Sequence, residues 1–157
     1  MRVFESFSVG AFSCLVALVA YAQSATPSLA NKTCRGTFRV PSANASPLKG
    51  MGGFQHRFAG TDTALSGHIW RAWGVAAFNR LAAEVDAKRL SSDMTDLEDM
   101  GDITNIVVDG RHVTYKSAAG AKYDLIFDAG QLVGTVDPRG VPGQEKFVIA
   151  NVRMFCE

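Results

Sequence analysis

The C-terminal third of the chain alternates between apolar and polar side chains in short runs separated by turns. The turns fall at Asp109 and Gly110, around Gly120, and at Ala129 and Gly130. Period-two alternation with glycine in two-residue turns is typical of antiparallel hairpins. The pattern therefore predicts five antiparallel strands, within residues 103–108, 111–117, 121–128, 131–136 and 145–156.

The turn positions also predict which residues face one another. Two-residue turns place Phe127 opposite Leu132 in the later hairpin and Val108 opposite Arg111 in the earlier one. In both hairpins one face is then mostly apolar and the other polar. This is the pattern of an antiparallel sheet that is covered on one side.

An earlier run, Cys34 to Val40, alternates in the same way and predicts a first strand. It is followed by a stretch rich in Ser, Ala, Pro and Gly, which extends to Gly53 and indicates a loop.

Residues 63–90 show helical spacing instead. Trp70, Trp73, Ala77, Leu81 and Val85 recur at intervals of three and four, which predicts one long helix with a wide apolar stripe. The glycines at 67 and 74 are unfavourable within a helix, so the helix could also begin near Trp70.

This order of elements predicts an α+β domain with an N-terminal strand, one long helix and a five-stranded antiparallel meander curved around the helix. Such an arrangement resembles cystatin-like, NTF2-like and hot-dog folds. The alternative is a small calycin-like β-barrel with a helical lid, similar to lipocalins and fatty-acid-binding proteins. Gly36-Thr37-Phe38 resembles the lipocalin G-x-W motif, with Phe in place of Trp, and Arg153 resembles the Arg that packs against it.

The first residues have the features of an export signal. An apolar run from Val9 to Ala20 precedes Ala20-Tyr21-Ala22, a small-x-small pattern suited to signal peptidase. We therefore expect a signal peptide over 1–22, a flexible lead over 23–32 and a single domain over 33–157. The expected location is periplasmic or secreted, with no membrane attachment after cleavage.

Export determines how the three cysteines are interpreted. Cys14 lies within the expected signal, which leaves Cys34 and Cys156 at opposite ends of the mature chain. In an oxidising compartment two such thiols are expected to form a disulfide.

Charge and motifs offer little specific chemistry. Sixteen basic and 15 acidic residues give a net charge of +1, which provides no attraction for nucleic acid. The three histidines form no HExxH pair, no GxSxG elbow is present, and we predict no metal and no cofactor. Thr95 to Glu98, in an acidic stretch, fits a capping box that opens one helical turn.

Three functions remain open. The first is a binding protein that holds a small apolar molecule between helix and sheet, with a site formed by Trp70, Trp73, Tyr115, Tyr123 and Phe127. The second is a module that binds or inhibits another exported protein. Residues 117–123 resemble the inhibitory loop of bacterial c-type lysozyme inhibitors, and this resemblance implies contacts by Ser117 and Lys122. The third is an enzyme without a recognisable motif, for which no catalytic residue can be named.

Overall fold

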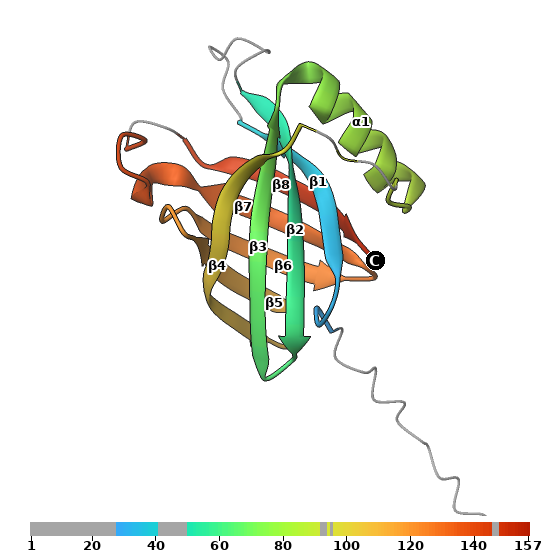
Figure 1. Ribbon diagram of the computed structural model, residues 1–157, viewed down its shortest axis with the longest axis vertical. Coiled ribbons are helices and arrows are strands. Elements are labelled where there is room, and N and C mark those ends of the chain that lie inside the picture. Colours follow the sequence, from blue (N-terminus) through green and yellow to red (C-terminus); the bar gives the residue numbers. More distant parts are fainter. Residues whose placement is uncertain (1–27, 41–49, 92–93, 95, 146–147) are drawn as a thin grey trace, which may run out of the picture.

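The computed structural model describes residues 28–40, 50–91, 94, 96–145 and 148–157. The predicted signal peptide and the first part of the predicted lead lie outside these ranges. The described residues form β1 (Thr33–Arg39), β2 (Met51–Thr61), β3 (Ala64–Trp73), α1 (Gly74–Ala87), β4 (Glu98–Asp109), β5 (His112–Ser117), β6 (Lys122–Asp128), β7 (Gln131–Asp137), the 3-10 helix η1 (Pro138–Gly140) and β8 (Ala150–Cys156) (Figure 1).

The strands form a closed antiparallel barrel in which each strand pairs with its neighbours in sequence and β1 also pairs with β8. Cys34 lies directly opposite Cys156 at this seam. The Thr33 amide donates to the Glu157 carbonyl at 2.8 Å, and the Glu157 amide donates to the Thr33 carbonyl at 3.0 Å. The preferred prediction of a five-stranded meander around the helix is therefore wrong. The closed barrel of the alternative prediction is present, but the helix lies against the barrel wall and does not form the predicted lid.

Strand β2 begins in the predicted loop and continues through residues 54–61, for which the sequence predicted no element, and β3 occupies the first part of the predicted helix. The true helix begins only at Gly74, whose φ of +93° reverses the chain after β3. Glycine adopts this conformation without steric cost, so it permits the abrupt change from strand to helix. The predicted helix over 63–90 is thus wrong in its first half.

The remaining differences lie around β4 and at the last strand, which was predicted over 145–156 and begins only at Ala150 in the structure. Thr95 of the predicted capping box lies outside the described residues, and Glu98 already begins the strand. In the hairpin that follows, Val108 pairs with Val113 and not with Arg111, because the turn lies one residue later than predicted. The predicted pairing of Phe127 with Leu132 is confirmed.

Helix α1 lies beside the barrel, against the outer surface of its wall (Figure 1). Leu81 is fully buried there, above Gly53 of β2, where an added Cβ would come within 1.9 Å of the Leu81 Cδ1 atom. Glu84 on the same face lies 3.7 Å from Arg35 of β1. The predicted helix–sheet contact exists, but on the convex side of the sheet. Within the described residues no helix is long and apolar enough to span a bilayer.

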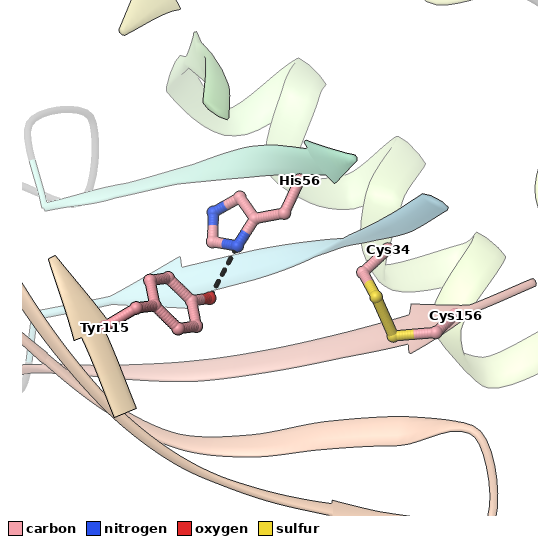
Figure 2. Close-up of a disulfide and its surroundings, with 4 residues drawn as sticks. All are labelled: Cys34, His56, Tyr115 and Cys156. Carbon is pink, nitrogen blue, oxygen red and sulfur yellow. Dashed lines mark hydrogen bonds between the residues drawn. A yellow bond between two sulfur atoms is a disulfide. The ribbon is translucent and has the colours of Figure 1, made fainter. Parts of the chain in front are cut away.

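The barrel interior is a packed apolar core. Inward-facing residues on alternate positions of each strand fill it, as expected of a small barrel. At one end, Leu29 from the segment before β1 is buried, and the predicted disulfide between Cys34 and Cys156 is present with its sulfurs 2.05 Å apart (Figure 2). The chain entering and leaving the barrel is therefore fixed at this end.

Candidate functional site

A cavity of about 220 Å³ lies at the other end of the barrel, away from the disulfide. Its lining is mostly apolar and comes from strands and from the loops that join them. The lining residues are Phe38, Val40, Phe54, Ile69, Arg71, Trp73, Met100, Ser117, Ala119, Ala121, Tyr123, Val136, Pro138, Val141, Gln144, Val148 and Ala150.

Strand alternation explains why these residues converge. In β3, Ile69, Arg71 and Trp73 occupy alternate positions and point to the same side of the sheet. Tyr123 of β6 and Ala150 of β8 reach the cavity from the far wall. The chain that follows β7, including η1, contributes further apolar residues to its mouth.

Arg71 is the one charged residue that lines the cavity among those described. Its Nη2 atom donates to Glu98 Oε2 at 2.9 Å, and its guanidinium carbon lies 4.1 Å from the centre of the Trp73 ring. Trp73 Nε1 donates to the same Glu98 oxygen at 3.2 Å. The Arg71 Nε atom is buried and has no hydrogen-bond partner among the described residues.

This arrangement fixes the charges at the cavity wall. The hydrogen bond and the charge of Arg71 lower the pKa of Glu98 below its usual range, so Glu98 is ionised at neutral pH. Burial raises the pKa of Tyr123 well above the ordinary phenol value, so its hydroxyl keeps its proton. The cavity thus presents a guanidinium and a neutral phenol within apolar walls.

Below the cavity, aromatic side chains form a continuous stack. Tyr123 stacks on Tyr115 with ring centres 4.7 Å apart, and the Tyr115 hydroxyl lies 2.7 Å from His56 Nδ1. Figure 2 shows His56 and Tyr115 pointing toward one another across the barrel interior. Burial lowers the pKa of His56 to about 3, so this imidazole is neutral at ordinary pH. The floor of the cavity is therefore uncharged.

The structure brings together only part of the predicted ligand site. Trp73 and Tyr123 line the cavity, and Tyr115 lies directly behind Tyr123. Phe127 is buried in the core without lining the cavity. Trp70 alternates with the inward residues of β3 and lies beside His68, with ring centres 4.4 Å apart and the rings tilted by 46°.

A second hollow, of about 290 Å³, lies between α1 and the end of β3. Its lining consists largely of alanine and of the charged residues Arg80 and Asp96, with Trp73 at its edge. It lacks the aromatic walls of the barrel cavity. We therefore place the candidate apolar site inside the barrel and not between helix and sheet.

The residues predicted to contact a protein partner are oriented differently from one another. Ser117 is buried, lines the cavity, and accepts a hydrogen bond from the Ala121 amide at 3.1 Å. Lys122 is exposed at the start of β6. The structure does not bring these two side chains to one common surface.

Sequence reasoning missed Arg71. The signal that could have found it is the alternation from Leu65 to Trp73, which places Arg71 on the same side as Ile69 once this segment is read as a strand. The helical spacing of the tryptophans concealed this pattern.

Outside the cavity, the acidic residues pair with histidines on the surface. His112 Nε2 lies 2.6 Å from Asp124 Oδ1, and His68 contacts both Asp99 and Asp102. Among the described residues, no group of three or more His, Cys, Asp or Glu side chains is placed to hold a metal ion. These contacts are exposed and join neighbouring strands.

Comparison of the chain with protein-family models, with curated proteins and with solved structures found no match in any of the three.

Proposed function

We propose that this protein binds a small apolar molecule in the cavity at the end of the barrel. The observation that carries the proposal is the cavity itself, about 220 Å³ in volume and walled mainly by aliphatic and aromatic side chains. Concave apolar sites with a few convergent polar groups are the usual form of small-molecule sites.

The size of the cavity suggests the size of the ligand. An apolar cavity of about 150 Å³ accepts benzene in another protein, so about 220 Å³ suits a molecule of roughly nine non-hydrogen atoms. The disulfide supports a setting in an oxidising compartment, such as the periplasm or the cell exterior.

Binding of indole, a neutral compound of suitable size, tests the proposal by isothermal titration calorimetry. We expect saturable one-to-one binding to the wild-type protein. The variant Ala150→Leu should abolish binding, because Ala150 is 3% exposed and a larger side chain there must enter the cavity.

Ala118→Leu is the matched control, since Ala118 is exposed in the β5–β6 turn and does not line the cavity. It should bind indole as the wild type does. Absence of binding to the wild type, or equal binding to the Ala150→Leu variant, would overturn the proposal. Thermal unfolding verifies that each variant is folded.

A further inference from the structure

Arg71 is held in place before any ligand arrives. Trp73 covers one face of its guanidinium, and Glu98 accepts one hydrogen bond from Nη2. The Arg71 side chain is 16% exposed, whereas Glu98 is 54% exposed. Glu98 therefore contacts the guanidinium from the solvent side, and Arg71 forms part of the cavity wall.

The Nε donor of Arg71 is the unusual feature of this site. It is buried, and no described residue accepts its hydrogen bond. A buried donor on a charged group is destabilising unless an acceptor satisfies it. None of the residues that line the cavity accepts this hydrogen bond, so a ligand that carries an acceptor would remove the penalty.

We propose that the ligand is a small monocarboxylic acid, whose apolar body fills the cavity and whose carboxylate accepts hydrogen bonds from Arg71. This inference rests on the proposed function and specifies the chemical class of its ligand. Guanidinium and carboxylate are complementary in charge and in planar geometry, and their charge-assisted hydrogen bonds are stronger than neutral ones.

Two further observations favour an anion over a neutral acceptor. No carboxylate lines the cavity among the described residues, so an acid inside it meets no repulsion from its immediate walls. Tyr123, whose hydroxyl remains protonated, lines the same cavity and adds a potential second donor. A cation would meet the guanidinium and is therefore excluded.

The test compares phenylacetate with phenylacetamide, which has nearly the same shape and no charge, by calorimetry at pH 7. We expect the wild type to bind the acid about ten- to a hundredfold more tightly than the amide, the range for a hydrogen bond to a charged group. In Arg71→Met this preference should disappear, and thermal unfolding verifies that the variant is folded.

Glu98→Gln is the matched second variant. It removes the neighbouring carboxylate that competes for the guanidinium, while its amide oxygen can still accept the hydrogen bond from Nη2. Phenylacetate should bind this variant more tightly than the wild type, and phenylacetamide should bind both equally.

The outcomes separate the two proposals. Equal affinity of the wild type for acid and amide, or an acid preference that survives Arg71→Met, would overturn the carboxylate inference and leave the apolar site standing. If indole, acid and amide all fail to bind the wild type, both proposals are overturned.

Discussion

His56 is fully buried among aromatic rings in the centre of the barrel, where a charge is strongly disfavoured. Its folded pKa is lowered to about 3, against about 6.5 in the unfolded chain. Below pH 6.5 the unfolded chain takes up a proton that the folded protein cannot accept. Stability is therefore highest above pH 6.5 and is lost as the pH falls toward 3.

We predict that the free energy of unfolding falls by about 1.4 kcal/mol for each pH unit below 6.5 from His56 alone. Urea unfolding at pH 7.5 and pH 5 measures this slope, above the range in which most carboxylates titrate. The variant His56→Gln, which retains a partner for the Tyr115 hydroxyl, should not show this fall in stability. Parallel pH slopes for the wild type and the variant would contradict the prediction.

His68 behaves in the opposite way. Its Nδ1 lies 2.8 Å from Asp102 Oδ1 and its Nε2 lies 2.6 Å from Asp99 Oδ1. Since a carboxylate only accepts hydrogen bonds, both ring nitrogens donate, which requires the imidazolium form. The hydrogen bonds and charges of Asp102 and Asp99 thus raise the pKa of His68 above its ordinary value.

We predict an NMR titration midpoint for His68 above 6.5, and a lower midpoint in Asp102→Asn, because Asp102 makes the largest contribution. The stabilisation that His68 gains from Asp99 and Asp102 is fully present below pH 6.5, and it is lost as the pH rises through the raised pKa of His68. An unchanged His68 midpoint in Asp102→Asn would show that the contact between His68 and Asp102 does not form in solution.

At the scale of elements, the apolar contact of α1 with the barrel rests on two buried side chains. Leu81 and Val85 are almost fully buried, and Gly53 leaves the space that Leu81 occupies. We predict that Leu81→Ala lowers the free energy of unfolding by about 2 to 5 kcal/mol, as for other large-to-small core changes.

Asn79→Ala, on the exposed side of the same helix, is the control and should change stability by less than about 0.5 kcal/mol. Urea unfolding measures both variants. Equal effects would indicate that α1 packs only loosely against the barrel wall.

The later hairpins were predictable because their alternation is local, and the turn at Ala129 and Gly130 sets the register by itself. The segment 64–73 was not predictable, because Trp70 and Trp73 fit a helical spacing that continues to Val85, whereas strand alternation places only Ile69 and Trp73 on one face. Pairing of β3 with both β2 and β4 decides between them, and that pairing is long-range. Tertiary contacts here override the local pattern.

The candidate site was predictable to the extent that its residues lie on correctly predicted strands. Tyr123 was identified because the strand that carries it, β6, was predicted correctly. Trp73 was chosen as a helix residue and lines the cavity as a strand residue, whereas Trp70, chosen for the same reason, lies on the other face. Arg71 could not be identified while its segment was assigned to a helix, since only the strand assignment turns its side chain inward.

For the whole molecule, the covalent bond between β1 and β8 closes a loop with a sequence separation of 122 residues. On the chain-entropy model, a loop of this length contributes about 5 kcal/mol by restricting the unfolded chain. We predict that a reducing agent lowers the free energy of unfolding by about that amount.

The double variant Cys34→Ala/Cys156→Ala should match the reduced wild type and be insensitive to reductant. Urea unfolding with and without reductant measures the free energy of unfolding of the wild type and of the double variant. Equal stability of the oxidised and reduced wild type would contradict the prediction.

Closure of the barrel also governs how the protein meets copies of itself. Because β1 pairs with β2 on one side and with β8 on the other, neither β1 nor β8 offers a free edge at the seam to which another chain could add. Separation of β1 from β8 would create two such edges at once. The pairing of β1 with β8 therefore protects against fibrous self-association. A molecule in which these two strands have separated is expected to aggregate before it unfolds completely.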